Sequence, residues 1–144
     1  VAEYVKDKLN ADILELEPEE PFSSDYDEVV REWQNNDLKR DVKIKPIKMD
    51  LSKYKKVVLI TGTWWYGITP VMKKFLKDYD LSNKDIIVAS SNAGWIGHCF
   101  KDYETLLPNS NIKGKLDLVF SAEEGKRNKM LTSYEDINSW IENL

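Results

Sequence analysis

Cysteine, histidine and long apolar runs are scarce in this chain of 144 residues, and each scarcity excludes a class of protein. Cys99 is the single cysteine, which excludes an internal disulfide framework and a CxxC metal or redox pair and suits a reducing cytosol. No apolar run approaches the ~20 residues that a membrane helix needs, and the opening VAEYVKDKLN lacks the apolar core of a signal peptide. We therefore expect a soluble cytoplasmic protein with no membrane partner.

Basic residues are also in the minority, because 21 Lys and Arg face 25 Asp and Glu, which gives a net charge of −4. Duplex nucleic acid requires a dense basic patch, so nucleic acid is not an expected partner. The segment between Leu9 and Val30 holds eight acidic residues and no basic one. Such a segment is usually a solvated loop, although a patch of one sign can also steer a basic redox partner toward the protein.

What the chain does have is an alternation of helical and strand patterns within a length typical of one domain, 1–144. Apolar runs predict parallel strands near 12–16, 56–61, 85–90 and 115–121. Helical spacing and capping residues predict helices over 1–9, 26–39 and 69–79, one that ends at 107, and one over 133–144. This order is typical of an α/β fold, a three-layer α/β/α sandwich with a parallel sheet.

Two unusual loops follow neighbouring strands of the predicted sheet. TGTWWYG occupies residues 61–67, and SSNAGWIG occupies residues 90–97. Ligands of such sheets bind beyond the carboxyl ends of the strands, so glycines and aromatic side chains from both loops should meet in one crevice. The aromatic residues could cover the core or hold a partner protein. They could equally stack on a planar ligand whose edge takes hydrogen bonds from the backbone of a glycine-rich loop.

The stretch YKKVVLITGTWWYGITPVMKKFLKDY, followed by DIIVASSNAGWIG, resembles the flavodoxin-like family of FMN-binding proteins. It is most similar to the branch whose first flavin loop reads roughly G-x-P-x-W-W/Y-G and continues into a helix started by proline. The similarity extends over the whole chain in element order and is most specific between Tyr54 and Leu107. Thr63 stands where that branch usually has proline.

The resemblance implies that FMN is the cofactor and that the two loops cradle its isoalloxazine ring. In the first loop, the residues implied to bind the cofactor are Thr61, Gly62, Thr63, Trp64, Trp65, Tyr66 and Gly67. In the second loop, they are Ser91, Asn92, Ala93, Gly94, Trp95 and Gly97.

Members of that family start with a strand and a phosphate-binding loop, for which the sequence printed here has no counterpart. VAEYVKDKLN matches the helix that follows the loop, so we expect the first, central strand of a flavodoxin-like sheet of order 2-1-3-4-5 to be absent from this sequence. We expect the gap between the first two predicted strands to be empty or filled from outside 1–144. One candidate to fill it is another copy of the chain, in a homodimer.

The resemblance implies an FMN-binding electron-transfer protein or a small flavin-dependent reductase of the NAD(P)H or quinone type, with a redox partner protein in the first case. A flavin-less domain of the same fold that uses its aromatic loops to bind a partner protein is the alternative. His98 could donate a proton, although a histidine at a helix start more often faces solvent or caps the helix. Cys99 is expected in the core. No G-x-S-x-G motif supports a hydrolase.

Overall fold

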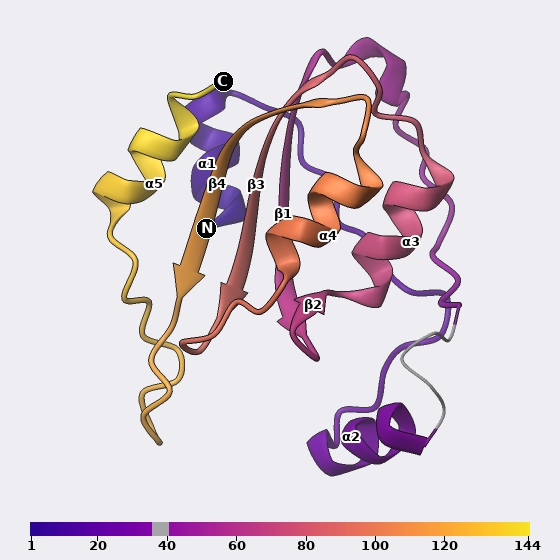
Figure 1. Ribbon diagram of the computed structural model, residues 1–144, viewed down its shortest axis with the longest axis vertical. Helices are drawn as coiled ribbons and strands as arrows, with labels where there is room; N and C mark the ends of the chain where they lie inside the picture. The colour runs from indigo at the N-terminus through magenta and orange to yellow at the C-terminus, as the bar shows by residue number, and fades with distance from the viewer. Residues whose placement is uncertain (36–40) are drawn as a thin grey trace.

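One sheet with the strand order β2-β1-β3-β4 forms the centre of the molecule (Figure 1). The computed structural model describes residues 1–35 and 41–144. The strands are β1 (Lys56–Trp64), β2 (Gly67–Ile68), β3 (Asp85–Asn92) and β4 (Asn111–Val119). The helices are α1 (Ala2–Leu9), α2 (Tyr26–Asn35), the short 3₁₀ helix η1 (Leu51–Lys53), α3 (Pro70–Asp78), α4 (Cys99–Leu106) and α5 (Tyr134–Ile141). The end of the helix predicted over 26–39 lies outside the described residues.

The three longer strands run parallel to one another, as predicted. Leu59 of β1 lies opposite Val88 of β3, and Ala89 of β3 lies opposite Leu116 of β4. The sheet as a whole is mixed, because the two-residue strand β2 returns antiparallel to the end of β1. The flavodoxin-like α/β fold predicted from the sequence is thus confirmed, with a short hairpin at the end of β1 that the sequence pattern did not indicate.

The apolar run of β3 is continuous because both faces of this central strand are covered by helices. Ile86 and Val88 belong to the core cluster that contains residues of α3 and α4, whereas Ile87 and Ala89 belong to the cluster that contains residues of α1 and α5. All four side chains are fully buried. Figure 1 shows the resulting three layers, with α3 and α4 in front of the sheet and α1 behind it.

Three helices begin at residues whose side chains cap them. The Thr69 hydroxyl accepts a hydrogen bond from the Met72 N–H at 3.3 Å, and Pro70 occupies the first turn of α3, where its missing N–H has no consequence. Ser133 forms a capping box with Asp136 at the start of α5. The Asp25 carboxylate accepts from two N–H groups at the start of α2. Local chemistry therefore accounts for where these three helices begin.

The strand predicted over 12–16 is wrong. This segment has no partner strand in the described sheet, and Ile13 is 42% exposed instead of buried on both faces. Its continuation pairs with 43–45, since Lys45 N–H donates to the Glu17 carbonyl and Glu19 N–H donates to the Lys43 carbonyl, both at 2.9 Å. The apolar pair Ile13 and Leu14 indicated an extended backbone, but a strand also needs a neighbour that supplies its hydrogen bonds.

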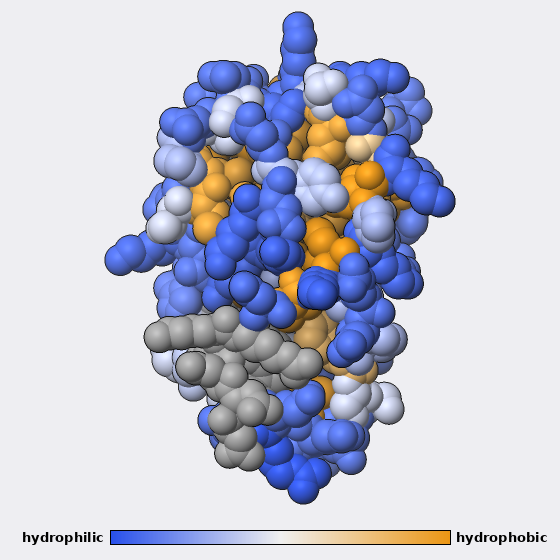
Figure 2. Space-filling model, turned by 90° about the vertical axis from the view of Figure 1, so that its right-hand side faces the viewer, coloured by the Kyte–Doolittle hydropathy of each residue, from blue (hydrophilic) through white to orange (hydrophobic). Residues whose placement is uncertain are grey.

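Part of the apolar core is covered only loosely. Four hydrophobic residues from the long connection before β1 pack against the α3 and α4 side of the core while remaining partly exposed, namely Leu16, Ile44, Ile47 and Leu51. Figure 2 shows apolar surface between polar side chains on the face that looks to the right in Figure 1. The connection thus covers this side of the core without forming a regular layer over it.

Tyr103 fixes α4 on the sheet and supplies a stability prediction. Its ring is fully buried, and its hydroxyl donates to the Ala89 carbonyl of β3 at 3.2 Å. We expect Tyr103→Phe to lower the free energy of unfolding by about 0.5–1.5 kcal/mol, the usual net contribution of one hydrogen bond. Urea unfolding followed by circular dichroism measures the change, and an unchanged midpoint would contradict the prediction.

Tyr103 also gives the stability a pH dependence at the alkaline end. Burial, with a smaller contribution from Cys99, raises the pKa of the Tyr103 phenol well above its ordinary value of 10.0. The folded state therefore keeps this proton when the unfolded state loses it, so the stability present below pH 10 falls as the pH rises further. The fall should be smaller in Tyr103→Phe than in the wild type, as measured by urea unfolding at pH 9 and pH 11.

Candidate functional site

Trp65 and Tyr66 occupy the tip of a tight hairpin between β1 and β2. Trp64 pairs with Gly67 across the hairpin, and both central residues have positive φ angles, 46° for Trp65 and 65° for Tyr66. Two positive φ angles are the requirement of a type I′ turn, where Asn and Gly are the usual residues. An L-residue in the left-handed region costs about 1–2 kcal/mol, so this turn holds two bulky aromatics under backbone strain. Strain of this kind is concentrated at functional sites.

The two loops predicted to converge do so through their aromatic side chains. The rings of Tyr66 and Trp95 lie with centroids 4.4 Å apart at an angle of 45°. Both rings remain open to solvent, with exposed fractions of 51% and 66%, and Trp65 beside them is 36% exposed. Large aromatic residues are normally buried for most of their area, so three exposed ones at the carboxyl end of a parallel sheet form a candidate ligand surface.

Trp64 plays a different part from its two neighbours. It is the last residue of β1, it is partly buried, and its ring lies 4.9 Å from that of Phe22 at an angle of 54°. The Phe22 contact joins the acidic connection before α2 to the end of β1. For Trp64 the packing interpretation of the aromatic run is therefore supported, whereas Trp65 and Tyr66 keep their exposed faces.

Gly97 allows the second loop to approach the backbone of the first. Its φ is +60°, and a Cβ at this position would lie 2.2 Å from the Tyr66 carbonyl oxygen, far inside van der Waals contact. The next residue, His98, donates its backbone N–H to the same oxygen at 2.6 Å. Only glycine fits here, and the two loops are joined directly through main-chain atoms.

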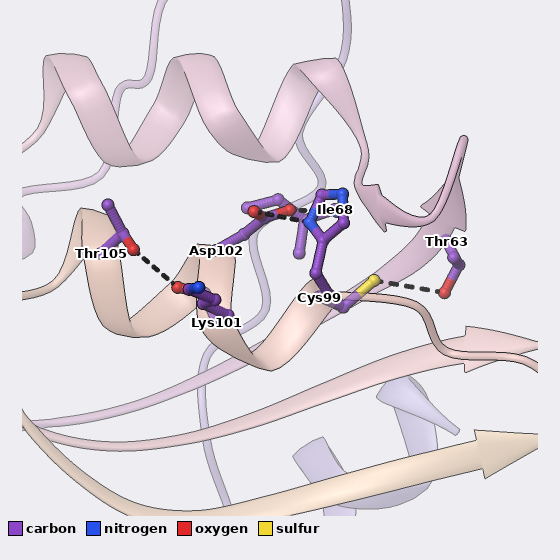
Figure 3. A network of polar contacts seen from close by, with 7 residues as sticks. Thr63, Ile68, Cys99, Lys101, Asp102 and Thr105 are labelled. Atoms are coloured by element: carbon purple, nitrogen blue, oxygen red, sulfur yellow. Dashed lines mark hydrogen bonds and ion pairs between the residues drawn. The ribbon is translucent and has the colours of Figure 1, made fainter.

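Thr61 and Thr63 were predicted in the first loop but lie in β1, and their hydroxyls contact other side chains of the protein. Thr61 and Thr69 share a hydrogen bond of 2.7 Å, and Thr63 lies 3.2 Å from the hydroxyl of the fully buried Ser90. Figure 3 shows Thr63 and the sulfur of Cys99 joined across the strand end at 3.4 Å. Cys99 is fully buried, which confirms its predicted place in the core. Thr63 thus supplies polar contacts that the family's usual proline could not make.

The second loop is folded by its own asparagine. The Asn92 side chain accepts from the Gly94 N–H at 2.9 Å and donates to Asp117 at 2.5 Å. Ala93 and Gly94 are exposed, and Ser91 is partly buried. Of the residues predicted here, Asn92 therefore shapes the loop by accepting the Gly94 N–H, and Ala93 between them is exposed.

Asp102 is a part of this region that the sequence reasoning missed. Its carboxylate accepts from the Ile68 N–H at 3.1 Å and lies 2.9 Å from Nδ1 of His98. Figure 3 shows the Asp102 side chain reaching from α4 toward Ile68. The His98 side chain is half exposed at the N-cap of α4, although it makes no capping hydrogen bond. The spacing of His98 and Asp102, four residues apart in a helix start, was the available signal.

Within 1–35 and 41–144, no group of three or more His, Cys, Asp or Glu side chains is arranged to hold a metal ion. No helix in those same ranges has the length and apolar character needed to cross a membrane.

Comparisons with known proteins agree with this architecture. The family model described as Flavodoxin matches residues 1–144. A candidate flavoprotein from Bacteroides eggerthii has a similar structure, with a TM-score of 0.75 and 20% identity, and the match covers 97% of this chain and 85% of that one. A candidate flavoprotein from Bacteroides uniformis gives a TM-score of 0.73, 16% identity and coverage of 97% and 86%.

A flavoprotein from Lactobacillus acidophilus, solved in complex with FMN, is a more distant structural relative. Its TM-score is 0.56 at 14% identity, and the match covers 96% of this chain and 89% of that one. No curated protein sequence matches the chain significantly. At these identities the solved structures support the fold, and the family match over the whole chain supports the resemblance found in the sequence.

Proposed function

Because the chain belongs to the flavodoxin family, we propose that it binds FMN with the two aromatic loops and acts as an electron-transfer protein or a small flavin-dependent reductase. The single observation that carries the proposal is the strained turn at Trp65 and Tyr66. Two aromatic residues occupy left-handed positions that Asn and Gly would occupy without strain, and their rings are left in solvent beside Trp95.

The residues present fit a flavin ring. A planar heterocycle needs aromatic faces to stack on and backbone N–H groups to meet its carbonyl and nitrogen edge. Exposed rings come from Trp65, Tyr66 and Trp95, and exposed backbone comes from Ala93, whereas the Gly94 N–H is bonded to the Asn92 side chain. Gly94 has no atom within 4 Å of where its Cβ would stand, so the loop leaves open space at that point.

Each part of the site has a role that follows from its chemistry. Bound FMN supplies transfer of one or two electrons. The aromatic side chains exclude water from the ring and provide stacking contacts, while Gly67 and Gly97 let the backbone of the turn lie close to α4 and to the second loop. Apolar faces against the ring disfavour additional negative charge, which lowers the potential of the second electron step. The hydroxyls of Thr61 and Thr63 hold the end of β1 in place through their contacts with Thr69 and Ser90.

A binding measurement on the full-length protein tests the proposal. We expect the purified protein to bind FMN with quenching of flavin fluorescence, and Trp65→Ala or Tyr66→Ala to weaken binding about tenfold or more. Stacking contributes ~0.5–1.5 kcal/mol beyond burial for a well-placed pair, and about 1.4 kcal/mol corresponds to one decade of affinity. Absorbance in the visible flavin bands reports bound cofactor independently.

Tyr134→Ala is the matched control, because Tyr134 is 54% exposed on α5 and contacts Tyr4 instead of the loops. This variant should bind FMN like the wild type. Unchanged FMN affinity in both loop variants would contradict the proposal and favour the alternative function, in which the aromatic loops bind a partner protein without flavin.

For the electron-transfer function we propose a redox partner with a basic surface. The acidic connection before α2 is exposed at Glu15, Glu19 and Glu20, while Glu17 pairs with Lys45, and Phe22 joins the connection to Trp64 at the site. An excess of negative charge near the site would raise the rate of association with a basic protein, and salt would screen it over ~8 Å at physiological ionic strength. Electron transfer from the reduced protein to the basic protein cytochrome c should therefore slow as salt is added. A rate independent of salt would contradict this proposal.

A further inference from the structure

The carboxylate of Asp102 contacts both the hairpin that carries Trp65 and Tyr66 and the residue that follows the second loop. Asp102 lies in the first turn of α4, where the helix dipole favours negative charge. Its Oδ2 accepts the Ile68 N–H, directly after the turn, and its Oδ1 meets the His98 ring, directly after the second loop. The Asp102 side chain is only 20% exposed, and Ile68 is 1% exposed. Because little water reaches these groups, the hydrogen bond to Ile68 has no ready substitute.

His98 makes a second connection through its own backbone. Its N–H donates to the Tyr66 carbonyl at 2.6 Å, so the residue whose ring meets Asp102 also holds the carbonyl of a strained turn residue. The side chains of Asp102 and His98 also pack tightly against Gly67. A Cβ on Gly67 would lie 2.6 Å from Asp102 Oδ2 and 2.8 Å from Cε1 of His98. Asp102, His98 and the backbone of 66–68 thus form one packed unit.

Such a unit is what a strained turn requires. Residues held in the left-handed region persist only where the surrounding structure restricts them to it. Trp65 and Tyr66 have no support from glycine or asparagine at their own positions, and their side chains point into solvent. The restriction has to come from the ends of the turn, and Ile68 and Tyr66 are where Asp102 and His98 attach.

We propose that Asp102 and His98 form a clasp that holds the 65–66 turn in the conformation that binds the flavin ring, and so set flavin affinity without touching the flavin. They are positioning residues, and the inference rests on the proposed function. Without the clasp the turn relaxes to conformations with less strain, in which the two aromatic rings no longer meet the second loop. Part of the binding energy of FMN is then spent on restoring the turn.

The test compares Asp102→Ala with Asp102→Asn in the full-length protein. Alanine removes both contacts, whereas asparagine keeps an oxygen for the Ile68 N–H and an amide that can donate to Nδ1 of His98. We expect Asp102→Ala to weaken FMN binding about tenfold or more and to speed hydrogen exchange of the Ile68 and His98 amides, which are bonded within the clasp, in the flavin-free protein. Asp102→Asn should restore affinity to within about threefold of the wild type.

Two further variants separate the clasp from general effects on α4. Glu104→Ala removes an exposed carboxylate of the same helix that pairs with Lys115, and it should leave FMN affinity unchanged. His98→Ala should weaken binding less than Asp102→Ala, because the backbone bond to Tyr66 remains. The double variant should bind no more weakly than Asp102→Ala alone, since both residues act through one unit.

The outcomes distinguish the clasp from the proposed function. If the wild type does not bind FMN, the proposed function fails and the clasp fails with it. If the wild type binds FMN and Asp102→Ala binds equally well, only the clasp is overturned. A lower thermal midpoint in Asp102→Ala with unchanged FMN affinity shows a merely structural role and also overturns it. Equal weakening by alanine and asparagine assigns the effect to charge instead of hydrogen bonds, which overturns it as well.

Discussion

Replacing Gly97 with alanine is expected to weaken FMN binding at least a hundredfold while the core stays folded. The new Cβ would lie 2.2 Å from the Tyr66 carbonyl oxygen and close to two further backbone atoms of that residue. Backbone atoms cannot rotate away as a side-chain tip can, so the second loop must withdraw from the turn. An alanine with a φ of +60° also costs about 1–2 kcal/mol of conformational free energy. A hundredfold weaker affinity corresponds to about 2.7 kcal/mol, which these two effects together supply.

Gly125→Ala is the matched control for this prediction. Gly125 also has a positive φ, +77°, but no atom lies within 4 Å of where its Cβ would be. It therefore carries the same kind of backbone strain without the collision. We expect Gly125→Ala to lower the thermal midpoint slightly and to leave FMN affinity unchanged. Fluorescence titration with FMN and thermal unfolding of both variants give the comparison, and similar affinities for the two variants would contradict the role of Gly97.

The parts of the fold that could be predicted from the sequence are those determined by local pattern. The runs that became β1 and β3 are apolar over several residues, and such runs predict strands covered on both faces. Thr69 followed by Pro70 and Ser133 followed by Asp136 are capping chemistry that needs no tertiary information. The segment over 12–16 failed because its pattern specifies an extended backbone, whereas a strand depends on a neighbour elsewhere in the fold.

In the candidate site, too, local features could be predicted from the sequence and features that depend on tertiary contacts could not. The apolar run and the proline-started helix placed TGTWWYG near a strand end, but β1 continues through Trp64, so the loop predicted over 61–67 is reduced to the turn at Trp65 and Tyr66. The left-handed angles of Trp65 and Tyr66 could not be predicted, since nothing in a Trp-Tyr pair favours them and the tertiary contacts must impose them. Asp102 was missed because its partner Ile68 lies 34 positions away, and only the packing of α4 on the hairpin brings the two together.

Replacing Trp65 with asparagine and Tyr66 with glycine in one variant is expected to stabilise the protein and to weaken FMN binding more than a hundredfold. Asn-Gly is the preferred pair of a type I′ turn, so the double variant removes strain of about 1–2 kcal/mol at each position. Trp65 is 36% exposed and Tyr66 51%, so the packing lost with the two rings, including the Tyr66 contact with Trp95, offsets only part of the strain released. We expect the free energy of unfolding to rise by about 1–3 kcal/mol, measured by urea unfolding of the flavin-free protein.

The matched control is the variant in which both residues become phenylalanine, because it keeps two rings and the same backbone strain. It should bind FMN within about fivefold of the wild type and unfold at the same urea concentration. The Asn-Gly variant should differ from it in both measurements and in opposite directions, more stable but binding more weakly, as expected where a strained site is maintained for function. An Asn-Gly variant that loses stability along with affinity would show that the two aromatic residues support the fold, and the turn would then be a packing feature instead of a binding one.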